Sequence, residues 1–155
     1  MKLYYLVLAA TLFTGLNTAN AQQTDLKTSQ DSLNHLLNEY YRLNVIVFQA
    51  NSTIEDINNI FELFTDDFTY VHEQYGGVYT RKDLYNGYKR NQENGGYDGE
   101  VTDIKVNSKI FGYNAIAISK SFMLKKKGGI KAGDPQLALF EFKDGKIYRI
   151  TEYWK

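Results

Sequence analysis

Histidine is the side chain that ordinarily exchanges a proton near neutral pH, and this sequence of 155 residues has two. One of them, His72, lies in the stretch FTDDFTYVHEQYGG at residues 64–77. Strand alternation there places Phe68, Tyr70 and His72 on one face. On such a face His72 could be a general base, a ligand contact or a polar residue satisfied inside a core. The other histidine, His35, is predicted to be solvated.

The composition argues against several other kinds of chemistry. The sequence has no cysteine, which excludes disulfides and thiol catalysis. Two histidines without cysteine also argue against a zinc site. We therefore predict neither a metal nor a cofactor.

The N-terminus has the order typical of a secretory signal peptide. Met1-Lys2 is followed by an apolar run from Leu3 to Leu12 and then by Ala19-Asn20-Ala21. We expect residues 1–21 to be removed, which makes the protein exported, either periplasmic or secreted. No membrane span would remain after cleavage, because the apolar run is short. The alternative is an uncleaved N-terminal anchor.

Charge and aromatic content limit the partners. Cleavage would remove one basic residue, Lys2, and leave one more acidic than basic residue in the chain. A nearly neutral chain lacks the clustered positive charge expected of a nucleic-acid-binding protein. The 13 Tyr, 9 Phe and 1 Trp must instead fill a core, a cavity or an interface.

The first half of the chain predicts helices. Leucine and tyrosine recur at three- and four-residue steps from Leu33, which indicates a helix continuing to about Ala50. A second helix is expected to begin after Thr53, where Asp56 would complete a capping box, and to end at Asp66-Asp67. A third helix is expected to follow Thr80.

Strands dominate the remainder. After a first strand ending near Glu73 and a brief one at Val78-Tyr79, alternation predicts four long strands: Glu100–Phe111, Ala115–Lys126, Gln136–Phe142 and Lys146–Trp154. Asp144-Gly145 is a strong hairpin signal between the last two. A Gly- and Lys-rich hairpin is expected to cover residues 127–135. The order of elements predicts one α+β domain over residues 33–155, preceded by a flexible segment at 22–32.

Two long side chains could meet beside the last hairpin. Glu141 and Arg149 lie at similar distances from Asp144-Gly145, so a cross-strand ion pair on the outer face is the simpler expectation. The alternative is an inward Arg149 that anchors an anionic ligand.

Two stretches carry a resemblance to a known superfamily. LFTDDFTYV at residues 63–71 and FEFKDGKIYRITEYWK at residues 140–155 are similar to the nuclear transport factor 2-like superfamily, in particular to its SnoaL-like and ketosteroid-isomerase-like small domains. The resemblance covers residues 33–155. It implies a cystatin-like cone, in which a curved antiparallel sheet wraps around the N-terminal helices and leaves a pocket at its wide end.

The site residues of these enzymes transfer only in part. The general base of ketosteroid isomerase would fall at His72. The acid of its sheet, like the strand acid of SnoaL-like cyclases, falls at Ala138, and its tyrosine falls near Asn44 or Phe48. The Arg-x-Asp pair of limonene epoxide hydrolase has no counterpart in TDIKV at residues 102–106.

Three functions stay open at this point. We expect an exported domain that binds a small, largely apolar molecule in an aromatic pocket. The ligand-binding candidates are Tyr40, Tyr41, Phe68, Tyr70, His72 and Phe140. The alternatives are a cofactor-independent isomerase, dehydratase or cyclase with His72 as the catalytic base, and a non-catalytic dimerisation or interaction module. A homodimer is expected, because aromatic residues on both faces of the sheet need cover.

Overall fold

A computed structural model describes residues 29–155 of the chain. The predicted signal peptide at residues 1–21 lies outside this range, as does most of the segment at 22–32. Residues 29–32 already belong to the N-terminal helix, which extends to residue 47. None of the helices in the described residues is long and apolar enough to cross a membrane.

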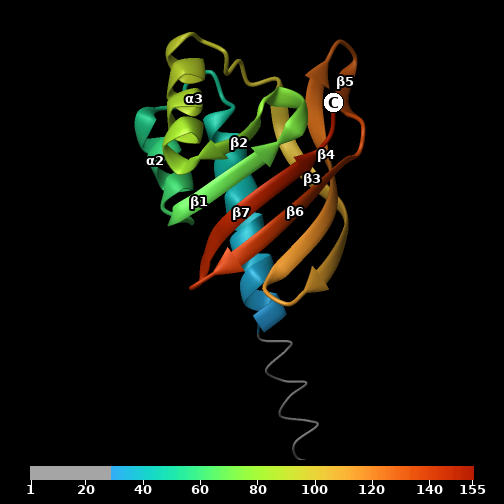
Figure 1. The fold of residues 1–155 in the computed structure, drawn as a ribbon. Helices are drawn as coiled ribbons and strands as arrows, with labels where there is room; N and C mark the ends of the chain where they lie inside the picture. The colour runs from blue at the N-terminus through green and yellow to red at the C-terminus, as the bar shows by residue number, and fades with distance from the viewer. Residues whose placement is uncertain (1–28) are drawn as a thin grey trace, which may run out of the picture.

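The N-terminal helix runs through the hollow of a curved sheet, and two shorter helices lie beside one edge of that sheet (Figure 1). The buried stripe of the N-terminal helix follows helical spacing and contains Leu37, Tyr40, Tyr41, Asn44 and Val47. This stripe faces the concave side of the sheet, so one helix supplies the centre of the core.

Both short helices begin at capping boxes. The second helix, α2 (Ile54–Phe61), is capped by Thr53, whose hydroxyl accepts from the backbone of Asp56 while the Asp56 carboxylate accepts from the backbone of Thr53. The third helix, α3 (Arg81–Glu93), has the same arrangement between Thr80 and Asp83. The capping box of α2 and the start of α3 at Thr80 were predicted from the sequence and are confirmed.

The sheet has the order β2-β1-β7-β6-β4-β3, and β5 pairs with β4 off this path. Its strands are β1 (Phe64–His72), β2 (Gly77–Thr80), β3 (Val101–Gly112), β4 (Ala115–Lys126), β5 (Gly129–Ala132), β6 (Gln136–Lys143) and β7 (Lys146–Tyr153). A short 3-10 helix, η1 (Glu73–Tyr75), joins β1 to β2. The predicted α+β cone is thus the observed architecture.

Three details differ from the sequence predictions. The sheet is mixed, because β1 pairs in parallel with β7; the two strands are far apart in sequence, so no hairpin forces them to be antiparallel. The helix before β1 ends at Phe61, and the exposed Asp66 and Asp67 lie inside β1. The segment at 127–135 contains a strand, β5.

The hairpin between β6 and β7 turns at Asp144 and Gly145, which both have positive φ angles of 53° and 73°. Just beyond the turn, Glu141 and Arg149 are register partners. Their charged atoms are 3.6 Å apart and both side chains are partly exposed. The predicted outer-face ion pair is confirmed, and Arg149 is not an inward anion anchor.

Strand β4 changes partner at its middle. Its first half pairs with β6 from Ala115 to Lys120, and its second half pairs with β5 from Met123 to Lys126.

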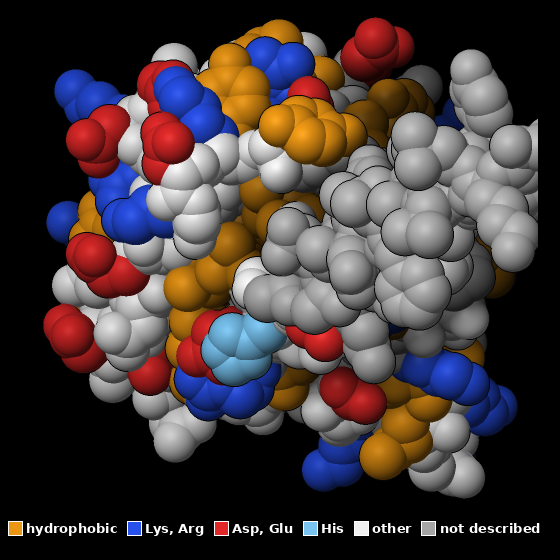
Figure 2. Space-filling model, turned by 90° about the horizontal axis from the view of Figure 1, so that it is seen from below, with side chains coloured by type: hydrophobic (Ala, Val, Ile, Leu, Met, Phe, Trp, Pro, Cys, Tyr) orange, Lys and Arg blue, Asp and Glu red, His pale blue; other side chains and the backbone are white. Residues whose placement is uncertain are grey.

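Figure 2 views the molecule from below, where charged and hydrophobic side chains are mixed on the surface. The C-terminus, β5 and the top of α3 lie at the opposite end (Figure 1). Residues of α3 and of the C-terminal end of the chain line the cavity described next.

Candidate functional site

A cavity of about 260 Å³ lies between the end of the N-terminal helix, α3 and the concave face of the sheet. The N-terminal helix contributes Tyr40, Tyr41 and Asn44, and α3 contributes Leu84 and Tyr88. The sheet and the C-terminal residues contribute Tyr70, Ile104, Lys120, Phe122, Glu152 and Trp154, and Phe48 completes the wall. Most of the lining is aromatic, as in pockets that bind small molecules.

A buried ion pair forms part of the wall. The Nζ atom of Lys120 lies 2.7 Å from Oε1 of Glu152, and the two side chains are 5% and 4% exposed. Lys120 is on β4 and Glu152 is on β7, so the pair spans the intervening strand β6. Neighbouring strands are about 4.8 Å apart, and the two side chains together bridge two such spacings.

The residue of β6 beside this bridge is Ala138, which is fully buried and is the register partner of Glu152. The family resemblance would have placed an acid at Ala138. In this chain the carboxylate is one strand away, at Glu152. Lys120 is the register partner of Gln136, two residues before Ala138, so the bridge crosses β6 beside the small Ala138 side chain.

Trp154 connects this ion pair to His72. The indole Nε1 of Trp154 donates a hydrogen bond of 2.7 Å to Oε2 of Glu152. The same indole packs edge-on against the His72 ring, with the ring centres 4.5 Å apart. Each carboxylate oxygen of Glu152 therefore accepts one hydrogen bond, and the indole separates the imidazole from the carboxylate.

A second polar group comes from the N-terminal helix. Asn44 is 3% exposed and donates through Nδ2 to the Tyr40 carbonyl, 2.8 Å away. Its Oδ1 accepts a 2.6 Å hydrogen bond from the Tyr88 hydroxyl on α3. The Asn44 side chain thus links α3 to the N-terminal helix.

The tyrosines of the wall are held in their neutral form. Burial raises the pKa of Tyr40 and of Tyr41 well above the ordinary value of 10. Burial also raises the pKa of Tyr70 and of Tyr88, and in Tyr88 a hydrogen bond with Tyr40 offsets part of the rise. All four hydroxyls therefore stay protonated to a higher pH than that of an exposed tyrosine.

One of these hydroxyls has no partner. Tyr41 is 5% exposed, and its hydroxyl makes no hydrogen bond with any residue from 29 to 155. The ammonium of Lys120 lies over the Tyr41 ring at 5.6 Å and over the Phe122 ring at 5.0 Å. The cation of the ion pair is thus also held by aromatic faces.

Three of the six predicted ligand residues, Tyr40, Tyr41 and Tyr70, line the cavity. The other three, Phe68, His72 and Phe140, are each 1% exposed or less and are not among its lining residues. Phe140 packs edge-on against Tyr40 and Tyr41, and Phe68 stacks on Phe64. Phe140 therefore belongs to the core beneath the cavity, and the buried Phe68 borders the separate cleft described below.

His72 lies on the predicted face of β1, but its ring is enclosed. The ring centres of Tyr75 and Trp154 are 4.4 Å and 4.5 Å away. Neither imidazole nitrogen has a hydrogen-bond partner among residues 29–155. The predicted contact between His72 and a ligand would have to pass Trp154, so the position gives little support to a catalytic role. His35, by contrast, is exposed as predicted.

Sequence reasoning missed Lys120, Glu152, Asn44, Tyr88 and Trp154 as site residues. A signal for two of them was present. Lys120 has the same strand parity as Ile116 and Ile118, and Glu152 has the same parity as Ile150; all three isoleucines are buried. Opposite charges on two inward faces predict a buried pair, because an isolated buried charge is strongly unfavourable.

A groove adjoins the cavity near the C-terminus. It has a volume of about 750 Å³ and shares Phe48, Phe122 and Trp154 with the cavity. Its other lining residues include Leu124, Pro135 and Tyr153. The groove and the cavity are therefore adjacent, with these three aromatic side chains in the wall of both.

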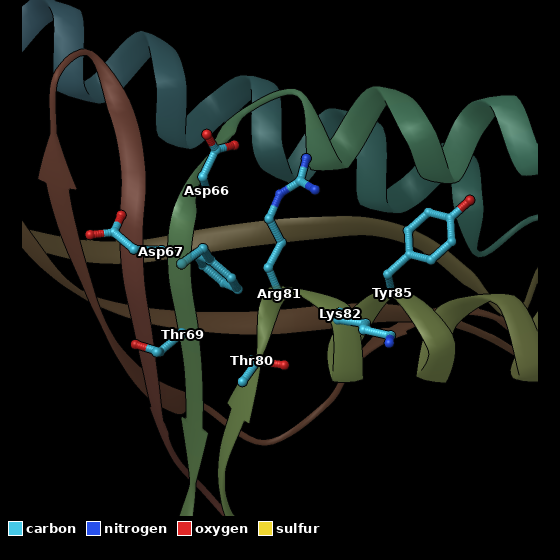
Figure 3. Close-up of a pocket in the computed structure, with 8 residues that line it drawn as sticks. Asp66, Asp67, Thr69, Thr80, Arg81, Lys82 and Tyr85 are labelled. Carbon is cyan, nitrogen blue, oxygen red and sulfur yellow. The ribbon is translucent and has the colours of Figure 1, made fainter.

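A separate cleft of about 520 Å³ lies on the other side of β1, near the start of α3 (Figure 3). Its polar side chains diverge, since Asp67 and Thr69 point away from Arg81. Asp67 accepts from Lys143, and Arg81 donates to the Phe61 carbonyl. Because Asp67 and Arg81 each bond to one of these groups, this cleft is a weaker candidate. The described residues also contain no cluster of potential metal ligands.

No family model matches the sequence, and no curated protein matches it. Solved structures match its fold. An epoxide hydrolase of M. tuberculosis described as LEH-like has a TM-score of 0.54 and 15% identity, over 81% of this chain and 84% of that one. A nuclear transport factor 2-like protein of unknown function from Burkholderia xenovorans has a TM-score of 0.53 and 17% identity, over 80% and 83%.

A third match is a protein of Catenulispora acidiphila with a ketosteroid isomerase-like fold, solved in complex with trimethylamine. Its TM-score is 0.52 and its identity is 15%, over 77% of this chain and 85% of that one. At these identities the likeness concerns the fold and not the chemistry. The helix inside a curved sheet, the cavity at its wide end and these matches together identify the chain as a protein of the nuclear transport factor 2-like fold.

Proposed function

We propose that this protein binds a small, largely apolar molecule in the cavity between the N-terminal helix, α3 and the sheet. The observation that carries the proposal is an aromatic cavity of about 260 Å³ with a few polar groups in its wall. Engineered cavities of about 150 Å³ hold benzene, and pockets for drug-sized molecules begin near about 300 Å³. The cavity volume therefore favours a compound with one substituted ring.

The geometry favours binding over the two alternatives. An isomerase, dehydratase or cyclase with His72 as base needs the imidazole to reach the ligand, and the ring is packed between Tyr75 and Trp154. An interaction module would have its pocket filled by its own side chains. The N-terminal sequence adds the proposal that binding takes place after export.

Binding can be tested by thermal shift and calorimetry with a panel of single-ring compounds. The variant Leu84→Phe adds a ring to the α3 side of the cavity and should lower the affinity at least tenfold while the fold is kept. Lys82→Ala is the matched control, because Lys82 is on the same helix but lines the cleft near β1. Equal affinity in the wild-type and Leu84→Phe proteins would show that ligands bind elsewhere.

A further inference from the structure

Building on the proposed function, we propose that the cavity takes an aromatic aldehyde and holds it covalently as an imine of Lys120. In this reaction the amine of Lys120 is the nucleophile, and the carboxylate of Glu152 moves the proton and then pairs with the product. The proposal rests on the position of the ion pair in the cavity wall, on its surroundings and on the charge of the imine.

The amine of Lys120 has apolar surroundings. Among the described residues that line the cavity, Lys120 is the only lysine. Its Nζ atom lies 5.0 Å from the ring centre of Phe122 and 5.6 Å from that of Tyr41. Lysines in hydrophobic pockets are the ones that form imines with carbonyl compounds. A molecule in the cavity therefore lies against a primary amine of the kind that reacts with an aldehyde.

The carboxylate beside this amine can carry out the proton transfers. Oε1 of Glu152 accepts a hydrogen bond of 2.7 Å from Nζ of Lys120, a distance that allows direct proton transfer. The other carboxylate oxygen accepts from the indole of Trp154, which can only donate. Trp154 thus keeps Glu152 directed at the amine. Stability alone does not account for the pair, since apolar residues of similar volume are often at least as stable.

The reaction needs no other reactant than the aldehyde. Glu152 takes a proton from the ammonium, and the neutral Nζ attacks the carbonyl carbon while the π electrons of the C=O bond move to the oxygen. A proton then passes from the nitrogen to that oxygen, which gives a carbinolamine. The protonated Glu152 returns its proton to the hydroxyl, the C–O bond breaks, and water leaves as the nitrogen lone pair forms the C=N bond.

The product keeps the charge balance of the wall. A protonated imine carries one positive charge, as the ammonium does, so Glu152 stays paired and no new charge is buried. The aromatic wall also limits the water that would hydrolyse the imine. An aldehyde fits better than a ketone, because its carbonyl carbon has a hydrogen in place of a second carbon substituent and the cavity has only about 260 Å³.

The test uses benzaldehyde and its unreactive analogue styrene, which has a methylene group in place of the carbonyl oxygen. The full-length protein is incubated with benzaldehyde and sodium cyanoborohydride and then digested, and mass spectrometry locates each benzyl group. We expect Lys120 to be labelled about tenfold faster than lysines on the surface, because the cavity holds the aldehyde beside it. An excess of styrene should slow the labelling of Lys120.

Lys143 is the matched internal control. Its ammonium also bonds to a carboxylate, that of Asp67 at 2.9 Å, but the side chain is about half exposed. Styrene should not change its labelling. The variant Leu84→Phe, which narrows the cavity, should slow the labelling of Lys120 and leave that of Lys143 unchanged.

Calorimetry with the same two compounds separates this proposal from the proposed function. If neither benzaldehyde nor styrene binds the wild-type protein, the proposed function fails as well. If both bind and Lys120 is labelled no faster than Lys143, binding stands and the imine is refuted. Labelling of Lys120 that bound styrene does not slow would equally refute an imine formed in the cavity.

Discussion

Lys120 and Glu152 form an ion pair across β6 in which both side chains are almost completely buried. The strands that carry them are not neighbours, because β6 lies between β4 and β7. Buried pairs of this kind contribute little net stability, but removal of one partner leaves an uncompensated charge. This asymmetry makes the pair a sensitive probe of the cavity.

Lys120→Met should therefore lower the free energy of unfolding by about 3–5 kcal/mol. Urea denaturation measures the change. The double variant Lys120→Met/Glu152→Leu should recover part of the loss, because it removes both charges. Lys143→Met is the control, since the Lys143–Asp67 pair is about half exposed and its loss should hardly move the midpoint. A Lys120→Met protein as stable as wild type would mean that the ion pair is open to water.

Alkaline pH should destabilise the fold. The pKa values of Tyr40, Tyr41, Tyr70 and Tyr88 are raised in the folded protein, chiefly by burial. Above pH 10 the unfolded chain loses these protons and the folded chain keeps them, so stability falls as the pH rises. Absorbance at 295 nm and far-UV circular dichroism, followed together, should show these tyrosines ionising as the protein unfolds. Full ionisation of all tyrosines near pH 10 in a folded protein would contradict this.

His72→Phe should fold at least as stably as wild type. The imidazole nitrogens have no hydrogen-bond partners in the described residues, and a phenyl ring keeps the contacts with Tyr75 and Trp154. Differential scanning calorimetry gives the melting temperature, and the affinity for a single-ring compound that binds the wild-type protein should stay within twofold. His72→Ala is the companion variant and should melt lower, because it leaves a cavity. A large loss of affinity in His72→Phe would show that the imidazole takes part in ligand binding.

The cap of α2 can be tested separately from the cavity. Thr53→Ala should lower stability by about 1 kcal/mol, since the Thr53 hydroxyl accepts from the backbone of Asp56. Ser52→Ala is the matched control one residue earlier, where the side chain does not cap the helix. The free energies of unfolding of the two variants, measured by guanidinium denaturation, should differ by about 1 kcal/mol. Equal midpoints would mean that the capping box is not formed in solution.

We propose a homodimer formed through the convex face of the sheet. Leu137 and Tyr153 are register partners on β6 and β7 and are 50% and 58% exposed. Large exposed apolar side chains of this kind often mark interfaces. Leu137→Glu should shift the protein toward the monomer in sedimentation velocity, and Lys146→Glu at the β6–β7 turn is the control. A wild-type protein that sediments as a monomer at high concentration would refute the dimer.

Most of the fold could be predicted from local signals. Helical spacing from Leu33, the Thr53–Asp56 capping box and the Asp144-Gly145 turn each depend on residues close in sequence, and all are observed. The parallel pairing of β1 with β7 and the strand β5 depend on distant partners. Local alternation carries no information about such partners.

The candidate site was harder to predict for the same reason. The aromatic candidates Tyr40, Tyr41 and Tyr70 follow from the pattern of one helix and one strand, and they line the cavity. Lys120 and Glu152 acquire their role from each other, 32 residues apart. His72 shares the face of Tyr70, but whether that ring meets a cavity or a neighbouring indole depends on Trp154.

The small side chain of Ala138 has a consequence for the charged residues around it. Beside this single methyl group, two strands without any common backbone hydrogen bond are joined by their side chains. The charge arrangement of the hollow thus depends on a residue with no functional group. A relative of this fold with a bulky residue at the same point would have to hold its lysine and glutamate apart, and its interior would have a different polarity although every charged residue was retained.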